Sequence, residues 1–141
     1  MKYVDTNVFG YAIENHHKYG KYCRKILEDI QSGKIKAACS MLVLAELIGV
    51  ILKINKELTK LSRKELDLRA NIDAILSLPI LWIELEFFII KRAAEYSYNI
   101  SGADYTHLAT MEVNGIYEII TADEDFDKAD FVRRTDPLEY Q

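Results

Sequence analysis

The sequence has few cysteines and histidines and no long uninterrupted apolar run. Its two cysteines, Cys23 and Cys39, are sixteen positions apart, and no histidine or further cysteine stands at zinc-site spacing. They are expected to be free thiols in a reducing compartment. Asp5 interrupts any signal-peptide core at once, and the longest apolar segment is too short to span a bilayer. We therefore expect a cytoplasmic protein with no membrane partner.

The signatures of several enzyme classes are also missing. No glycine-rich turn follows the first predicted strand, which argues against dinucleotide binding. No Ser or Cys has a convincing acid partner, so a nucleophilic triad is rejected. An aspartate-nucleophile phosphatase would carry Asp-x-Asp after its first strand, whereas this chain has Asp5-Thr6-Asn7. Without repeats, linkers or low-complexity tracts, the 141 residues predict one domain over 1–141.

Charge is divided unevenly between the two halves of the chain. Residues 1–70 hold 13 Lys/Arg and 8 Asp/Glu, a net +5, and residues 71–141 hold 5 and 14, a net −9. A basic half could meet a polyanion and an acidic half could collect a divalent cation, although solvated helix faces explain the same pattern.

Six residues form the densest basic stretch, and three roles are open to it. It could hold an RNA backbone, dock an acidic protein segment, or be a solvated helix face. Its members are Lys53, Lys56, Lys60, Arg63, Lys64 and Arg69.

Hydrophobic periodicity predicts strands that alternate with helices. Strand patterns occupy 2–6, 34–40, 80–86 and 116–123, with a weak edge strand at 131–134. Helical patterns occupy 7–14, 19–31, the segment through Glu46 to about 55, 62–77, 87–99 and 103–114. Such alternation is typical of an α/β layered domain with a mostly parallel sheet, here of four or five strands flanked by helices.

Glu46 is the residue whose environment is hardest to explain. It is the only charge between Ser40 and Lys53, and its neighbours at helical spacing are apolar. Glutamate is rarely buried unless it is paired or bound to a metal. A distant arginine or hydroxyl could satisfy Glu46. Alternatively, the helix carries it into a site shared with Asp5 and Asp123, which follow predicted strands and should lie at one edge of the sheet.

The other candidate acids have simple local explanations. Asp5 could cap the following helix. Asp104 and Glu124 each stand three residues after a Ser or Thr, as in a capping box, and Asp123 could be a first-turn acid that suits the helix dipole. If the acids instead converge, ionised carboxylates in one site need a cation or partial protonation. Oxygen ligands without His or Cys favour Mg²⁺ or Mn²⁺, the ions suited to phosphodiester hydrolysis.

Four short motifs together resemble the PIN-domain family, in particular its VapC-like toxin ribonucleases. They are VDTNV at 4–8, AEL at 45–47, GADYTHLAT at 102–110 and TADEDFD at 121–127. The resemblance spans nearly the whole chain. It implies a PIN-like three-layer fold and a metal-dependent endoribonuclease that hydrolyses RNA with a metal-activated water.

Carried over by motif, the metal-binding and catalytic acids would be Asp5, Glu46, Asp104 and Asp123. Thr6, Asn7, Thr121 and Asp125 would support them, and Asp125 or Asp127 could share the role of Asp123. All four acids of the pattern are present, which argues against an inactivated member.

The resemblance also implies partners. VapC-like proteins commonly form homodimers and are held inactive by an antitoxin, and the apolar helices between about 42 and 90 offer surface for both. Two alternatives remain open: a PIN-like scaffold that binds RNA or protein without cutting, and an RNA-processing nuclease outside any toxin pair.

Overall fold

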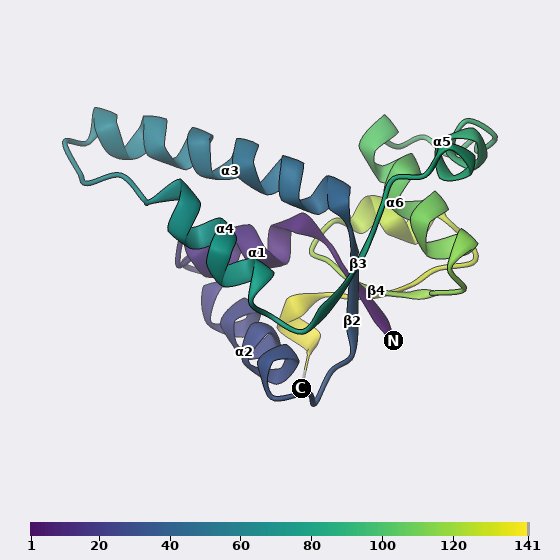
Figure 1. Cartoon of the computed structure of the whole chain (residues 1–141), viewed down its shortest axis with the longest axis horizontal. Helices are drawn as coiled ribbons and strands as arrows, with labels where there is room; N and C mark the ends of the chain where they lie inside the picture. The colour runs from purple at the N-terminus through teal and green to yellow at the C-terminus, as the bar shows by residue number, and fades with distance from the viewer. Residues whose placement is uncertain (141) are drawn as a thin grey trace.

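Parallel strands form the centre of the protein in this computed structural model, which describes residues 1–140. Across those residues one five-stranded sheet has the order β3-β2-β1-β4-β5 (Figure 1). All four neighbouring pairs are parallel, so the predicted α/β fold with a mostly parallel sheet is confirmed. The strands are β1 (Lys2–Val4), β2 (Ala37–Ser40), β3 (Ile80–Ile83), β4 (Glu118–Ile120) and β5 (Arg133–Thr135). Gln141, part of the predicted 1–141 domain, lies outside the described residues.

Helices cover both faces of the sheet and complete three layers. Because successive strand residues point to opposite faces, Val4 and Ile120 pack with one set of helices while Tyr3 and Ile119 pack with another. The helices are α1 (Thr6–Ile13), α2 (Gly20–Gln31), α3 (Met41–Lys60), α4 (Leu68–Leu76), α5 (Phe87–Ala93) and α6 (Gly102–Val113). Helices α1 to α4 contribute to the first core, and α6 with the 3₁₀ helix η1 (Glu124–Lys128) contributes to the second.

The helix through Glu46 is longer than its sequence pattern predicts. It was expected to end near Asn55, but α3 continues to Lys60 and Ser62 then takes a positive φ of 54°. Asn55 is buried, and its side-chain amide accepts from the Leu66 N–H at 2.7 Å and donates to the Leu66 carbonyl at 3.0 Å. The polar residue that suggested a helix end therefore anchors the following loop, and α4 begins only after Asp67.

The helix after β3 is shorter than predicted, because the tyrosines that follow it pack against α6 and do not continue the helix. It ends at Ala93 instead of residue 99. The Tyr96 hydroxyl donates to Glu112 of α6 at 2.8 Å, and Arg92 binds the same carboxylate through two nitrogens. Tyr96 and Tyr98 therefore lie in a loop that packs along α6, although their spacing in the sequence is typical of an amphipathic helix.

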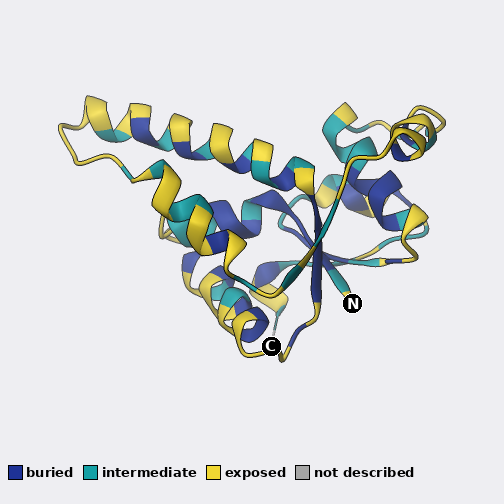
Figure 2. Ribbon diagram, viewed as in Figure 1, coloured by how far each residue is buried: buried dark blue, intermediate teal, exposed yellow. Residues whose placement is uncertain are grey.

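Exposure differs sharply between helices, as Figure 2 shows. One side of α3 is buried against α1 and α4, and its opposite side is exposed. Helix α5 exposes large apolar side chains: Phe87 is 81% exposed, Phe88 50% and Ile90 48%. Within residues 1–140, none of the helices combines the length and apolar character needed to cross a membrane.

Candidate metal centre

The candidate site lies where the strand order reverses, at the carboxyl ends of the central strands. Strand β1 leads to β2 on one side and pairs with β4 on the other. Asp5 follows β1, and Thr121 and Asp123 follow β4. Parallel α/β sheets bind ligands at such positions. The sequence expectation that Asp5 and Asp123 share one sheet edge agrees with this placement.

Asp5 is buried and held by three donors. Its Oδ1 accepts from the Thr6 N–H at 2.7 Å, and its Oδ2 accepts from the Thr121 hydroxyl at 2.7 Å and the Asn7 amide at 3.2 Å. Burial raises the pKa of Asp5, and the positive field of His107 and the bonds from Thr121 and Thr6 act against that rise. Asp5 is also the N-cap of α1, so the capping explanation and the site explanation apply to the same side chain.

Asn7 and Thr121 connect the two strand ends. The Asn7 amide donates to the Thr121 hydroxyl oxygen at 2.8 Å, and its carbonyl oxygen accepts from the Ala122 N–H at 3.2 Å. The Thr121 oxygen also accepts from the Asp123 N–H at 3.0 Å. These supporting residues therefore fix the backbone that carries the last acid relative to Asp5.

Glu46 reaches the site from the second turn of α3. Its Oε1 accepts from the Thr6 hydroxyl at 2.9 Å and lies 2.6 Å from His107 Nε2. Burial alone would raise the pKa of Glu46, but the bonds from His107 and Thr6 outweigh it and the pKa is lowered. The Glu46 side chain is 32% exposed. It is therefore not enclosed by apolar side chains, as its sequence neighbours had suggested. A hydroxyl does satisfy Glu46, and that hydroxyl belongs to the same cluster as Asp5.

His107 is the member of this cluster that sequence reasoning missed. It lies one turn after Asp104 on α6, is fully buried, and joins Glu46 to the Tyr3 hydroxyl, which lies 2.5 Å from its Nδ1. Tyr3 in turn accepts from the Ser40 N–H at 3.1 Å. Burial opposes a charged imidazole, but Glu46 and Asp5 outweigh it and raise the pKa of His107. The signal available was its spacing from Asp104, since residues three apart share a helix face.

The remaining predicted acids form a second group beside the first. Asp104, Asp123 and Asp125 each place a carboxylate oxygen within 4.8 Å of the others. Burial and then the negative charges of Asp123 and Asp5 raise the pKa of Asp104 to about 6. Asp5 and His107 of the first group are among the charges that act on Asp104, which indicates that the two groups lie close together. The capping contacts are real too: Ser101 accepts from the Asp104 N–H, and Asp123 from the Asp125 N–H.

The two aspartates that the sequence could not rank lie in different surroundings. Asp125 belongs to the acidic group and also contacts Lys128 at 2.9 Å. Asp127 is held by Arg134, whose Nε and Nη2 donate to its two oxygens at 3.0 and 3.1 Å. Asp127 is therefore engaged away from the cluster.

This donor set fits a divalent cation. Each cluster alone brings three potential ligands within 4.8 Å, namely Asp5, Glu46 and His107 in one and Asp104, Asp123 and Asp125 in the other. Burial, and then the charge of Asp123, disfavours an ionised Asp104, and a bound cation would offset that cost. Five carboxylates and one imidazole could supply the oxygen-rich coordination of Mg²⁺ or Mn²⁺.

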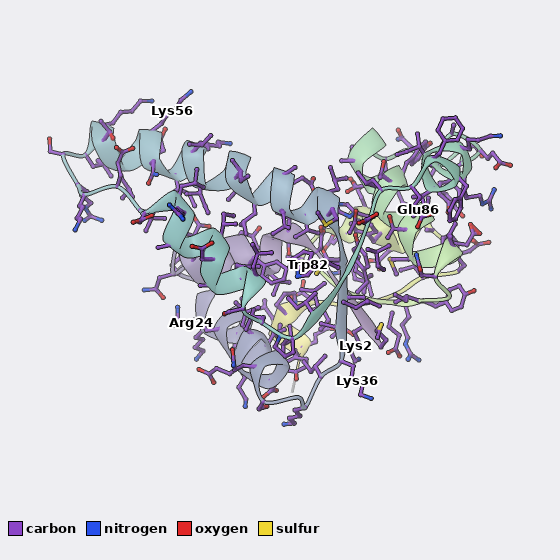
Figure 3. The ribbon with its side chains drawn as sticks, viewed as in Figure 1. Lys2, Arg24, Lys36, Lys56, Trp82 and Glu86 are labelled. Carbon is purple, nitrogen blue, oxygen red and sulfur yellow. The ribbon has the colours of Figure 1, made fainter. Side chains whose placement is uncertain are left out.

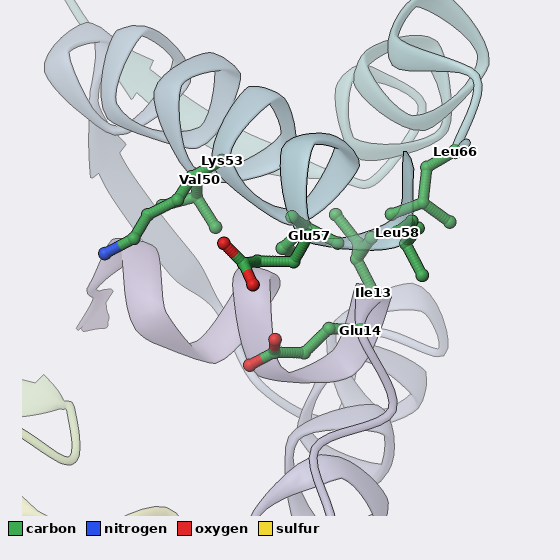
Figure 4. A pocket seen from close by; sticks show the side chains of 8 residues that line it. Ile13, Glu14, Val50, Lys53, Glu57, Leu58 and Leu66 are labelled. Atoms are coloured by element: carbon green, nitrogen blue, oxygen red, sulfur yellow. The ribbon is translucent and has the colours of Figure 1, made fainter. Parts of the chain in front are cut away.

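The basic stretch lies mostly away from these acids. Lys53 is seven residues beyond Glu46, or about 10 Å along the helix, and Lys60 is about 21 Å beyond. Figure 3 shows Lys56 projecting outward from the far half of α3. Lys53 lines a groove of about 560 Å³ between the end of α1, α3 and the loop before α4, together with Glu14 and Glu57 (Figure 4). The five residues from Lys53 to Lys64 predicted to bind RNA are all exposed and remain a prediction: Lys53, Lys56, Lys60, Arg63 and Lys64.

Comparison with solved structures supports the same fold. The VapC20 toxin of Mycobacterium tuberculosis, described as cleaving the sarcin–ricin loop, has a TM-score of 0.71 at 19% identity, covering 94% of this chain and 97% of that one. VapBC2 of Rickettsia felis, bound to promoter DNA, has a TM-score of 0.67 at 19% identity with coverage of 96% and 98%. A toxin–antitoxin complex from Klebsiella pneumoniae has a TM-score of 0.63 at 19% identity with coverage of 99% and 100%.

A search of curated sequences finds no match to this chain. The family model described as "PIN domain", in contrast, matches residues 2–132. That range begins in β1 and contains every residue of both acidic groups. The chain belongs to the PIN-domain family.

Proposed function

We propose that this protein is a Mg²⁺- or Mn²⁺-dependent endoribonuclease of the cytoplasm and the toxin of a toxin–antitoxin pair. One observation carries the proposal: at the strand-order reversal of a PIN domain, Asp5 and Glu46 belong to one group of potential metal ligands, and Asp104 and Asp123 belong to a second. PIN domains are generally nucleases, and the solved structures described above come from toxin–antitoxin systems.

In this proposal each residue has a defined task. Asp5 keeps one carboxylate orientation because three donors hold it. His107 and Thr6 keep Glu46 ionised and aimed at Asp5. Asp104, whose pKa is raised to about 6, would be shifted toward its ionised form by a bound cation. A divalent cation, when bound, would activate water and neutralise charge that develops on the phosphate.

RNA cleavage by wild type and Glu46→Gln tests the function. The panel should contain structured RNAs, including a sarcin–ricin loop, with Mn²⁺, Mg²⁺ or EDTA, and circular dichroism should verify folding. We expect wild type to cut only with metal and the folded variant to lose at least 100-fold in rate, since it lacks one charged ligand. Glu28→Gln, the same change at an exposed position of α2, is the matched control and should cut normally.

Four results would each contradict a different part of the proposal. Equal cleavage by Glu46→Gln would make Glu46 a structural acid. Cleavage that persists in EDTA would contradict the metal dependence. RNA binding without any cleavage would favour the scaffold alternative. Cleavage that serves RNA maturation, with no antitoxin encoded nearby, would favour the RNA-processing alternative.

The partners belong to the same proposal. The exposed apolar side chains of α5 are a suitable surface for a homodimer, since isolated soluble domains rarely expose so many together. An antitoxin would find further apolar surface in the groove between α1 and α3, where Val50 and Leu58 lie. Co-purification with the product of an adjacent gene, and loss of cleavage in that complex, tests this part.

A further inference from the structure

The corner between α1 and α2 carries an aromatic cluster beside the acidic site. We call Tyr11, His16, His17 and Tyr19 the aromatic corner. Tyr11 stacks on Tyr19 with ring centroids 4.9 Å apart and an interplanar angle of 15°. His16 is tilted against Tyr11 at 4.6 Å, and His17 stacks on His16 at 4.6 Å with an interplanar angle of 20°.

The cluster is both preorganised and accessible. His16 Nδ1 accepts from the Lys18 and Tyr19 N–H groups at 3.1 and 3.2 Å, which fixes its ring. Tyr11 and Tyr19 pack against the core with their inner parts but remain partly exposed, and His17 is exposed. Core packing therefore accounts for one side of the cluster and leaves the other open to a ligand.

Its position is tied to the acids by helix geometry. Asn7 bonds directly to Thr121 and Ala122, next to Asp123. Tyr11 is one turn further on the same face of α1, about 6 Å along the axis. The charge of Asp123 is among the causes that raise the pKa of Tyr11, after burial, Tyr19, Glu14 and Cys23.

Three basic side chains lie on or close to the aromatic corner. Lys18 Nζ lies 5.3 Å from the Tyr19 ring centroid, and Lys21 Nζ lies 5.2 Å from that of Tyr22. Arg24 bonds to Asn15 in the same corner. Flat rings interleaved with cations are the combination that binds unpaired nucleotides, the rings by stacking on bases and the cations by attracting phosphates.

We infer that the aromatic corner is a base-stacking subsite that holds an unpaired RNA base next to the phosphate presented to the acidic site. The inference rests on the proposed function, and it specifies the substrate as RNA with at least one unstacked base near the cleavage position. It also gives Lys18 and Lys21 a role in holding the RNA backbone.

Equilibrium binding tests the inference separately from catalysis. The probes are a fluorescein-labelled single-stranded oligoribonucleotide and the same oligonucleotide with abasic positions, in Ca²⁺ buffer. His17→Ala removes an exposed ring, and Tyr11→Leu removes a partly buried one. Tyr117→Leu is the control, because Tyr117 is 48% exposed but precedes β4 at the end of the strand opposite the acids.

The expected loss follows from stacking. Each of the two variants should bind the normal oligonucleotide roughly 5- to 150-fold more weakly than wild type does. The abasic oligonucleotide should bind wild type and variants alike, and the control should behave as wild type. Should Tyr11→Leu misfold, His17→Ala alone decides the outcome.

The failures are distinguishable. Unchanged binding by the variants, equal losses on the abasic oligonucleotide, or no RNA binding by wild type would each overturn the stacking subsite. The proposed function is tested by cleavage instead. If wild type cuts RNA, and His17→Ala cuts and binds RNA as well as wild type does, the nuclease function stands and the stacking subsite is refuted.

Discussion

Replacing Asp104 with asparagine should stabilise the metal-free protein at neutral pH. Burial and the charges of Asp123 and Asp5 raise the pKa of Asp104 from 3.8 to about 6. A carboxyl group whose pKa is raised by folding contributes stability below its unfolded pKa and loses that contribution as pH rises through the folded value. At pH 8 the ionised carboxylate is therefore a net cost, and Asn removes it. The Ser101 cap survives, because it accepts from the Asp104 backbone.

The size of the effect follows from the shift. A change of about two pKa units corresponds to about 2.7 kcal/mol between the protonation states. Asp104 is only half-buried, so solvent screening and the favourable helix dipole reduce that figure to about 1 kcal/mol. For a domain of this size, Tm should then rise by about 3–5 °C.

Thermal unfolding in EDTA at pH 8 and pH 4.5 measures the difference in Tm between wild type and Asp104→Asn. Asp104→Asn should be more stable than wild type at pH 8, and the difference should shrink at pH 4.5, where wild-type Asp104 is mostly protonated. Asp73→Asn, at an exposed helix position, controls for the loss of one negative charge. A variant no more stable at pH 8, or an equal difference at both pH values, would refute the reasoning that burial and the neighbouring carboxylates raise this pKa.

Two further predictions follow from buried and exposed groups. Tyr3→Phe should lower the free energy of unfolding, measured in urea, by about 1–3 kcal/mol, because the Ser40 N–H and His107 Nδ1 lose a buried partner. An unchanged free energy of unfolding would contradict the hydrogen-bond assignment. Phe87→Lys combined with Phe88→Lys should convert a dimer to a monomer in light scattering, and a wild type already monomeric would remove the proposed interface on α5.

Strand ends were the part of the site most readily predicted from the sequence. Asp5 and Asp123 each follow a β-rich run, and parallel strands deliver such residues to one edge. Glu46 was detectable because it is the one charge in an otherwise apolar helical run. The alternation of strand and helix patterns likewise predicted the parallel sheet.

The remaining features depend on contacts between distant segments. His107 joins Glu46, 61 residues away, to Tyr3, 104 residues away, and no local pattern encodes that bridge. The choice between Asp125 and Asp127 is made by Arg134 in β5. The end of α3 depends on Asn55 reaching Leu66. Tertiary contacts determine each of these features, so local sequence propensity alone could not predict them.

Calorimetric titration with Mn²⁺ tests the central claim most directly. We predict that wild type binds Mn²⁺, that Asp123→Asn binds at least tenfold more weakly, and that Asp127→Asn, whose carboxylate is held by Arg134 outside the cluster, binds as wild type does. Absence of Mn²⁺ binding by the wild type, or equal affinity of all three proteins, would contradict a metal centre built from these carboxylates.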